Sequence, residues 1–580
     1  MKTKSNTSKI FGIAALILIV TFSLTAATCG SEAGSDGDFR SFLSDMFGGG
    51  KSKASSTASA SGNESSGAEE ATVAAAKAAE EVPAETSSDS KGSGGILSFL
   101  SGIFSRGSKK AGSSSGGGLS GIFGRSKDPE PTLDDLEFIL LDDGKAYAVK
   151  PNTYIIGGTV IPAKYKGKPV TTIPRRAFED YRHMTSIFIP KSITSIGERA
   201  FTNCESLESL AIPNSVTEIG DFAFAFCESV TSVNIPNSVT ELGMGAFSFC
   251  ENLTSVTIPN SVTGISDGLF AACESLTSVT IGNRVTSIGE RAFGACYGLT
   301  SITIPNNVTV IGETAFSNCK NLTSITLSNR LTEIGDGAFH NCENLASITI
   351  PNSVTDLGSS AFGNCTSLTS VTIPNNVKEI EYYAFGGCTG LTSVTIGNSV
   401  AMIGGSAFEN CTGLTSITIP NSVNEIGGSA FDGCTNLHSI NIGNSVAKIG
   451  GYAFDGCTSL ANVTIPDSVT EIGQRAFRGC TGLTSITIGN GVTTIAREAF
   501  AGCTGLTSIT VPNSVTTIEA WAFRYCSSLL SVTFQGTIAS GNFSQSDPFP
   551  GDLRAKYLAR NGGPGTYTRP GGNSGVWTKQ

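Results

Sequence analysis

Fifteen of the sixteen cysteines recur at a fixed interval of 23 residues, from Cys204 to Cys526. Thiolates bind zinc when two to four ligands converge, usually with a close C-x-x-C spacing. Each 23-residue unit supplies one thiol, and His183, His340 and His438 lie in separate units at different positions of the unit. The spacing therefore predicts no metal site.

Two states of the thiols fit this spacing. Stacked units place equivalent Cα atoms about 5 Å apart, within reach of a disulfide, although an odd number leaves at least one thiol unpaired. The alternative is a buried column of free thiols that pack as small apolar side chains. We favour the free column, because each cysteine follows a phenylalanine by three residues, a spacing typical of one helical turn facing a core. Representative core positions are Phe224, Phe247, Phe270, Cys227, Cys250 and Cys273.

Other catalytic chemistry finds little support. The chain has no G-x-G-x-x-G phosphate loop, Walker motif or H-E-x-x-H helix. Scattered carboxylates such as Glu218 and Asp356 do not form a catalytic pair. The net charge is −10, the pI is about 5.1, and no basic stripe is interleaved with aromatic residues. We expect neither an enzyme, nor a cofactor, nor a nucleic-acid partner.

The element that must position the cysteines is the repeat itself, L-x-x-V/I-x-I-P-x-x-V-x-x-I-G-x-x-A-F-x-x-C-x-x. Alternation at residues 256–258 predicts a short strand, which Pro259 ends. Val262 and Ile265 form a second apolar edge. In the next copy, Gly289 releases the backbone before the Ala-Phe pair. A 23-residue unit cannot bury these side chains alone, whereas stacked copies form one core. The sequence predicts a repeat solenoid of about 16 units over residues 173–534.

This repeat resembles the treponemal class of leucine-rich repeat found in BspA-like bacterial surface proteins. The resemblance implies an arc with a parallel β-sheet on its concave face, and short strands and one-turn helices on the convex side. It also implies an extracellular adhesion or host-interaction protein rather than an enzyme, with a ligand that does not carry over between members.

Two surfaces are candidate binding sites. A ladder of hydroxyls follows the expected concave sheet; the alternative is that Ser and Thr are simply strand-tolerant residues facing solvent. The positions are Ser255, Thr257, Ser278, Thr280, Ser301, Thr303, Ser324 and Thr326. Aromatic residues that the repeat does not require gather near the Ala-Phe turn, either as protein-binding anchors or partly buried between units. They include Phe222, Phe226, Phe249, Tyr382, Tyr383 and Trp521, and Phe226 and Phe249 occupy one slot in adjacent units, where their rings can stack.

The two ends of the chain differ from the array. Residues 1–28 have the basic start and apolar run of a signal peptide, followed by Cys29, which is either lipidated or left as a stray thiol by ordinary cleavage. Residues 29–132 are a low-complexity, disordered stalk, with short apolar islands that either touch lipid or are duplicated linker. Residues 133–172 form an N-terminal cap with a hairpin at Asp143-Gly144. Residues 535–580 form a C-terminal cap and tail, with a short helix capped by Asp552.

These observations predict an exported protein of the outer cell surface, lipid-anchored through Cys29 or, alternatively, secreted. Its expected work is adhesion to matrix proteins or surface proteins of a host or a neighbouring cell. One alternative is a structural, self-associating surface protein. Another is a surface that binds a repetitive glycan through the hydroxyl ladder.

Overall fold

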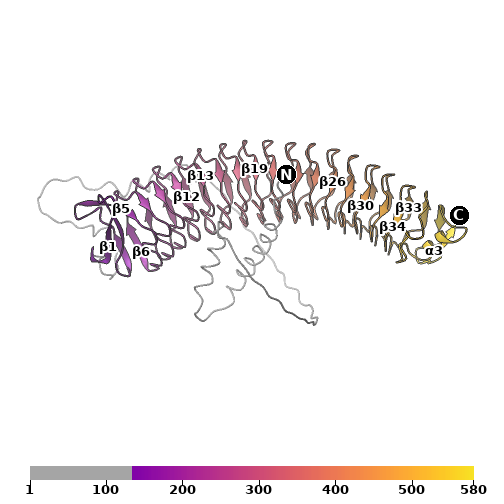
Figure 1. Ribbon diagram of the computed structural model, residues 1–580, viewed down its shortest axis with the longest axis horizontal. Helices are drawn as coiled ribbons and strands as arrows, with labels where there is room; N and C mark the ends of the chain where they lie inside the picture. The colour runs from indigo at the N-terminus through magenta and orange to yellow at the C-terminus, as the bar shows by residue number, and fades with distance from the viewer. Residues whose placement is uncertain (1–132) are drawn as a thin grey trace, which may run out of the picture. The chain divides into compact units, whose positions relative to one another are not determined.

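The computed structural model of the protein describes residues 133–580. The expected signal peptide, Cys29, the stalk and its apolar islands lie outside the described residues. Residues 133–580 form a curved solenoid of stacked coils (Figure 1). A typical coil contains a longer strand, a shorter strand and a segment of tight turns that leads to the next coil. Within this range, no helix has the length and apolar character needed to cross a bilayer.

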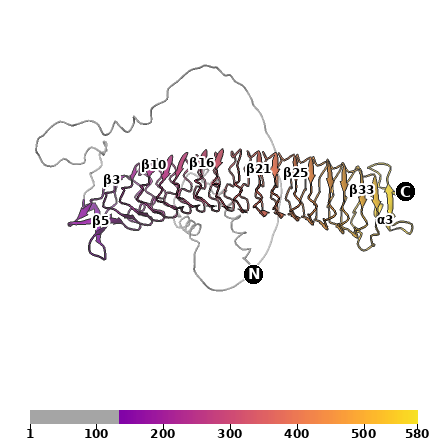
Figure 2. The same ribbon diagram turned by 90° about the horizontal axis from the view of Figure 1, so that it is seen from above.

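Two parallel ladders of strands run along the stack, because residues 23 positions apart pair with each other in adjacent coils. Ser255 lies opposite Ser278, for example, and Ile265 opposite Ile288. In Figure 2 the longer strands follow one another along one side of the array. This longer series consists of β6 (Met184–Phe188), β8 (Leu210–Ala211), β10 (Ser232–Asn234), β12 (Ser255–Ile258), β14 (Ser278–Ile281), β16 (Ser301–Thr303), β18 (Ser324–Thr326), β21 (Ser370–Thr372), β23 (Ser393–Thr395), β25 (Ser416–Thr418), β27 (Ser439–Asn441), β29 (Asn462–Thr464), β31 (Ser485–Thr487), β33 (Ser508–Val511) and β35 (Ser531–Phe534).

The shorter series carries the second apolar edge of the repeat, and its isoleucine or leucine is buried in every coil. It consists of β5 (Lys168–Ile173), β7 (Ser195–Ile196), β9 (Glu218–Ile219), β11 (Glu241–Leu242), β13 (Gly264–Ile265), β15 (Ser287–Ile288), β17 (Val310–Ile311), β19 (Glu333–Ile334), β20 (Asp356–Leu357), β22 (Glu379–Ile380), β24 (Met402–Ile403), β26 (Glu425–Ile426), β28 (Lys448–Ile449), β30 (Glu471–Ile472), β32 (Thr494–Ile495) and β34 (Thr517–Ile518). The repeat solenoid expected from the sequence is confirmed.

The segment around the Ala-Phe pair differs from the expected one-turn helix: it is a run of consecutive tight turns. Successive backbone N–H groups in this segment alternate between two kinds of acceptor, a carbonyl within the same turn and a carbonyl of the next coil. Gly294 N donates to Arg291 O at 2.9 Å, whereas Phe293 N donates to Ala315 O at 2.8 Å. Arg291 and Ala295 have φ of 52° and 57°, so the backbone switches hand twice and no helix can propagate. The i, i+3 spacing of Phe and Cys is therefore shared by a helix and by this turn.

Gly289 opens this turn for a steric reason rather than for the backbone freedom expected from the sequence. Its φ is not positive. A Cβ at this position would lie 2.7 Å from the backbone nitrogen of Asp267 in the preceding coil, a distance that real Cβ atoms do not adopt. Glycine here permits the close approach of successive coils.

The core is a single column that runs the length of the stack. One phenylalanine per coil, from Phe178 to Phe523, is fully or almost fully buried, and neighbouring rings stack face to face. The centroids of Phe224 and Phe247 are 5.4 Å apart, and those of Phe247 and Phe270 are 5.7 Å apart. Rings stacked at this spacing add attraction beyond the burial of their area, and each coil's ring depends on its two neighbours.

The N-terminal cap begins with a 3-10 turn (Leu133–Asp135) and the hairpin expected at Asp143-Gly144. Its strands β1 (Leu136–Leu140) and β2 (Tyr147–Pro151) pair antiparallel, and β2 then pairs in parallel with β5. Strand β3 (Gly157–Val160) lies against β6, and the short β4 (Lys164–Tyr165) returns on β5. The cap thus adds two strands, β1 and β2, to the shorter series and one strand, β3, to the longer series before the first repeat.

The C-terminal segment completes the last coil with backbone and side chains that imitate a further repeat. Phe523 N donates to Pro548 O at 2.8 Å, and the Phe549 ring stacks on Phe523 at 4.6 Å, extending the phenylalanine column by one ring. Helix α3 (Leu553–Leu558) follows, with Leu553 and Tyr557 buried. Asp552 does not cap this helix as expected; its carboxylate accepts from the backbone N–H of Trp577 at 2.8 Å instead.

The glycine-rich tail returns onto the solenoid. Strand β36 (Gly565–Thr568) pairs antiparallel with β35 and with β37 (Thr578–Lys579). Buried Arg569 donates to the carbonyls of Cys526 and Ser527 at 3.1 and 3.0 Å. These bonds satisfy carbonyls at the end of the stack that have no further coil to bond.

Candidate functional site

The surface whose side chains vary from coil to coil is the tight-turn segment, here called the turn edge and defined as residues G-x-x-A-F-x-x-C-x-x of each coil. Two positions per coil have left-handed backbone: the residue before Ala-Phe and the residue before Cys. The second position is most often Asn or Gly, which tolerate this conformation. A bulky side chain there strains the backbone, so aromatic residues at these positions call for an explanation.

The expected stack of Phe226 on Phe249 is present. The two ring centroids lie 4.5 Å apart with 8° between the ring planes. Both residues occupy the left-handed position before cysteine, with φ of 59° and 57°. Both side chains are half-buried, and Phe222, also left-handed, lies under the guanidinium of Arg199 at 5.6 Å. Phe226 and Phe249 therefore form a stacked pair on the third and fourth coils, counted from the coil of Phe178.

The middle of the turn edge carries Tyr382 and Tyr383. Tyr382 is 49% exposed. Tyr383 is half-buried and donates from its hydroxyl to Asn364 Oδ1 at 3.1 Å, at the end of a ladder of asparagine amides. In that ladder Asn364 donates to Asn341 at 3.0 Å, and Asn341 donates to Asn318 at 2.9 Å. Tyr383 is thus held by the scaffold, whereas Tyr382 faces solvent.

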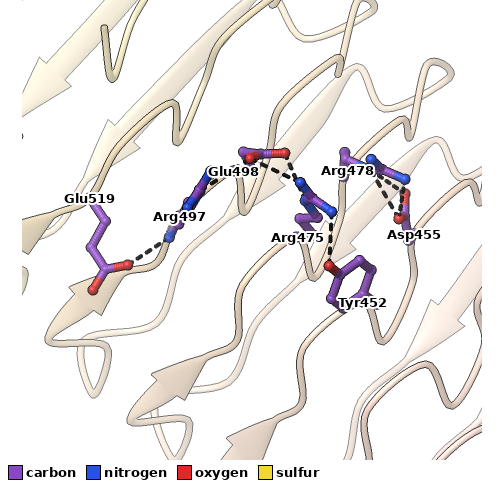
Figure 3. Close-up of polar contacts among 7 residues, drawn as sticks. All are labelled: Tyr452, Asp455, Arg475, Arg478, Arg497, Glu498 and Glu519. Carbon is purple, nitrogen blue, oxygen red and sulfur yellow. Dashed lines mark hydrogen bonds and ion pairs between the residues drawn. The ribbon is translucent and has the colours of Figure 1, made fainter. Parts of the chain in front are cut away.

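The last coils of the turn edge carry a network of arginines and carboxylates (Figure 3). Arg475 is bidentate to Glu498, with Nε–Oε2 at 2.7 Å, and also donates to the hydroxyl of Tyr452 at 2.8 Å. Arg478 binds Asp455 at 2.7 Å. The hydrogen bonds from Arg475 lower the pKa of Glu498. Because the partners are 23 residues apart, each pair ties one coil to the next.

Beside this network lies a platform of aromatic rings and cations. The guanidinium of Arg497 lies 4.5 Å from the ring centroid of Trp521. The guanidinium of Arg524 lies 5.4 Å from Trp521 and 4.6 Å from Tyr525, which is 65% exposed. Trp521 and Tyr525 both have left-handed backbone, with φ of 60° and 63°. Arginine held on aromatic faces keeps its N–H groups available for a carboxylate.

The cysteine column is buried, and all fifteen thiols are free. Each thiol points to the carbonyl oxygen of the phenylalanine in the preceding coil, 26 residues earlier. Cys227 Sγ lies 3.3 Å from Phe201 O, Cys250 Sγ 3.3 Å from Phe224 O, and Cys273 Sγ 3.2 Å from Phe247 O. Burial raises the pKa of these thiols well above the ordinary value. Among residues 133–580, no group of three or more His, Cys, Asp or Glu side chains is arranged to hold a metal ion.

The hydroxyl ladder is exposed on the longer strands, as the alternation of the repeat requires. The eight expected residues alternate with Val or Ile that are buried, or partly buried in the case of Val279, and they pair in register between β12 and β14 and between β16 and β18. Thr257 lies opposite Thr280, for example, and Thr303 opposite Thr326. In the described part of the chain, these eight hydroxyls have no intramolecular hydrogen-bond partner, so they are available to solvent or to a ligand.

Sequence reasoning found the aromatic positions but overlooked the arginines. Arg475, Arg478, Arg497 and Arg524 fall at variable positions of the repeat and read as scattered surface charge. The signal that could have found Arg475 was its position in the repeat. Arg475 is 23 residues from both Tyr452 and Glu498, so the stacking of coils places the three side chains in one column. The three histidines remain far apart in the sequence of coils and form no common site.

The family described as BspA type leucine rich repeat region matches residues 171–300, 286–414, 356–481 and 401–530. A leucine-rich repeat protein from Bacteroides ovatus has a similar structure, with 29% identity and a TM-score of 0.56, covering 70% of this chain and 100% of that one. A leucine-rich cell surface protein from Faecalibacterium prausnitzii is 30% identical, with a TM-score of 0.38, covering 71% of this chain and 96% of that one. The pneumococcal vaccine antigen PcpA is 19% identical, with a TM-score of 0.37, covering 71% and 95%. No curated protein matches significantly.

Proposed function

Because the chain belongs to the family of BspA-type leucine-rich-repeat proteins, we propose that it is a protein-binding scaffold of the bacterial cell surface that adheres to matrix or surface proteins of a host or a neighbouring cell. Proteins of this family are typically bacterial cell-surface proteins. Leucine-rich-repeat solenoids generally bind proteins along extended surfaces.

The observation that carries this proposal is the placement of aromatic side chains on strained backbone. Phe226 and Phe249 occupy left-handed positions that Asn or Gly fills in most other coils. Such strain costs on the order of 1–3 kcal/mol per residue and tends to be kept where a side chain serves a ligand. The array needs neither ring for its core, because the phenylalanine column is already complete. Stacked aromatic rings on a rigid scaffold are effective anchors for a protein partner.

The test replaces both rings with the residue that the repeat itself uses. The variant Phe226→Asn/Phe249→Asn copies the left-handed asparagines Asn318 and Asn341. The unchanged chain is first screened against a panel of matrix proteins, with mucin and polysaccharides alongside, to find a protein that it binds. We expect the affinity of the variant for that protein to fall at least tenfold, and its melting temperature to be unchanged or raised. The matched control is Ala272→Asn/Ala295→Asn, at the same position in the next two coils, which keeps the Phe226–Phe249 pair. Equal binding by both variants would remove the aromatic surface from the proposal.

The hydroxyl ladder supports a second candidate, binding of a repetitive polysaccharide, because its hydroxyls have no partner within residues 133–580. Polysaccharide binding lost in Ser278→Ala/Thr280→Val, and retained in the asparagine variant, would favour this function.

The proposed location at the outer surface includes a lipid anchor on Cys29. Cys29→Ser would then release the protein from the cell envelope, whereas ordinary cleavage near Ala27 predicts no change in the envelope-bound fraction. Mass spectrometry of the mature N-terminus reads out the same difference directly.

A further inference from the structure

The charges of this chain are sorted along the solenoid. Residues 200–283 contain nine acidic side chains and no lysine, arginine or histidine. Residues 474–580 contain nine basic side chains and four acidic ones. The chain carries −10 overall, so the positive C-terminal end is a local departure from its general charge. A separation of this kind creates an electrostatic field along the array.

On the acidic side, four successive coils place a glutamate directly after the cysteine: Glu205, Glu228, Glu251 and Glu274. Glu228 and Glu251 thus follow the stacked Phe226 and Phe249 by two residues each. Among the described residues, only Glu205 of these four makes a salt bridge, to Arg182. Burial raises the pKa of Glu228 and Glu274, and repulsion from Glu251 raises both further. The acidic–phenylalanine patch is defined here as Phe226, Phe249, Glu228, Glu251 and Glu274, and none of its three carboxylates makes a salt bridge within the described residues.

On the basic side lies the platform of Arg497, Trp521, Arg524 and Tyr525, whose Arg524 has no carboxylate partner among the described residues. Within the described residues Arg524 has aromatic faces as its contacts and makes no salt bridge. Arg497 contacts Glu498 at 3.3 Å, but Glu498 is already engaged in the bidentate pair with Arg475. This arginine–aromatic patch combines the residue types that dominate protein interfaces.

The two patches lie on the same turn edge but cannot meet within one copy. Cys250 and Cys526 are twelve coils apart, which corresponds to roughly 55 Å at the spacing of paired strands. A contact between them therefore joins two copies, and it is heterologous, because each copy offers one patch and keeps the other free.

We propose that a second copy of this chain docks its arginine–aromatic patch on the acidic–phenylalanine patch of the first, joining copies head to tail. The arginines meet uncompensated glutamates, and Trp521 and Tyr525 meet the stacked phenylalanines. Each patch combines aromatic rings with charges of one sign, and the charges of the two patches are opposite in sign. This goes beyond the proposed function, since a chain that never self-associates could still bind a foreign protein.

The first measurement is the mass distribution of the full chain by analytical ultracentrifugation, at 50 mM and 500 mM NaCl. Because the contact is formed by exposed charges, screening weakens it. We expect dimers and longer species at low salt, and an association constant at least tenfold lower at high salt. A protein that is monomeric at low salt across the micromolar range overturns the proposal.

The decisive experiment uses two variants that each destroy one patch. Glu228→Lys/Glu251→Lys removes the acidic side, and Arg497→Glu/Arg524→Glu removes the basic side. Each variant alone is expected to be monomeric. An equimolar mixture has one intact patch on each partner, so it is expected to form one-to-one dimers that do not grow further.

Two controls keep this result interpretable. Glu343→Lys/Glu409→Lys makes the same change in net charge on turn-edge coils between the patches, and is expected to associate as the unchanged chain does. Protection of the buried thiols from a thiol reagent reports that each variant is folded. Oligomers that persist in both patch variants, or a mixture that stays monomeric, would show that the copies do not join through these surfaces.

Discussion

At the scale of the residue, the repeated cysteine is a hydrogen-bond donor as well as a small apolar side chain. Cys365 donates from its thiol to Phe339 O at 3.3 Å and is fully buried. The variant Cys365→Ala removes the thiol bond to this carbonyl, which still accepts from the backbone N–H of Cys342 at 3.2 Å. It also opens a small cavity, and the two effects together are expected to cost about 1–3 kcal/mol. Urea unfolding measures this loss. The neighbouring exposed change Ser370→Ala serves as control, with an expected effect within about 0.5 kcal/mol, and an equal cost for both would contradict the role of the thiol bond.

The same thiols predict sensitivity to alkali. Burial raises the pKa of Cys319, Cys388 and Cys434 from 9.0 to about 12. An unfolded thiol loses its proton near pH 8.5. Between these values the unfolded chain binds fewer protons than the folded one, so stability is full below about pH 8.5 and falls as pH rises, by about 1.4 kcal/mol per pH unit for each such thiol.

Chemical denaturation between pH 8 and pH 11 checks this slope, with thiolate absorbance as the second signal. The triple variant Cys319→Ala/Cys388→Ala/Cys434→Ala is expected to be less stable at pH 8 but to lose stability less steeply above it. Thiolate absorbance that appears at pH 9 while the protein is still folded would show that the thiols are accessible.

The sequence was sufficient to place the cysteines in the core but not to find their partner. Periodicity puts Cys365 and Phe362 on one face of the coil. The acceptor is the carbonyl of Phe339 in the preceding coil, and only the path of that coil decides whether its oxygen, which accepts from the backbone N–H of Cys342, also lies within reach of the thiol. The arginines of the C-terminal coils were overlooked for a related reason, because Arg475 acquires its partners from coils on both sides.

At the scale of the element, the turn segment depends on two left-handed residues per coil. Gly456 has φ of 69°, and a Cβ there would meet only backbone of Gly433, at 3.9 Å. Space is therefore available, and only the backbone conformation resists substitution. Gly456→Ala is expected to lose about 1 kcal/mol of unfolding free energy. Gly456→Asn is expected to lose less, since asparagine occupies this position in several other coils. Thermal unfolding compares the two, and alanine that is as stable as asparagine would contradict the conformational argument.

This element is also where the sequence-based fold was least accurate. Ala-Phe-x-x-Cys was interpreted as one helical turn, since i, i+3 spacing is common to helices and to consecutive tight turns. The distinguishing signal was present in the residue before Cys, which is Gly or Asn in most coils. The strands and their register, in contrast, follow directly from the 23-residue period, because equivalent residues must pair when coils stack in line.

At the scale of the whole molecule, a solenoid has two open ends, and its stability depends on closing them. The C-terminal cap does so with Phe549, which is buried against Phe523 and stands where a seventeenth repeat would place its ring. In such arrays each unit contacts only its neighbours, so a local defect is expected to loosen the nearest coils before distant ones.

Phe549→Ala tests this directly. Removal of the Phe549 ring is expected to lower the local unfolding free energy by about 3–5 kcal/mol. The reason is that one face of the Phe523 ring, which Phe549 covers, then becomes exposed to solvent. Hydrogen exchange should show lost protection in the coils of Cys503 and Cys526 and unchanged protection in the coils of Cys204 to Cys273. Val576→Ala, at a side chain that is 58% exposed in the same cap, should leave both regions unchanged. Equal loss of protection along the whole array would mean that the sixteen coils unfold as one cooperative unit, and that the phenylalanine column transmits a defect over its full length.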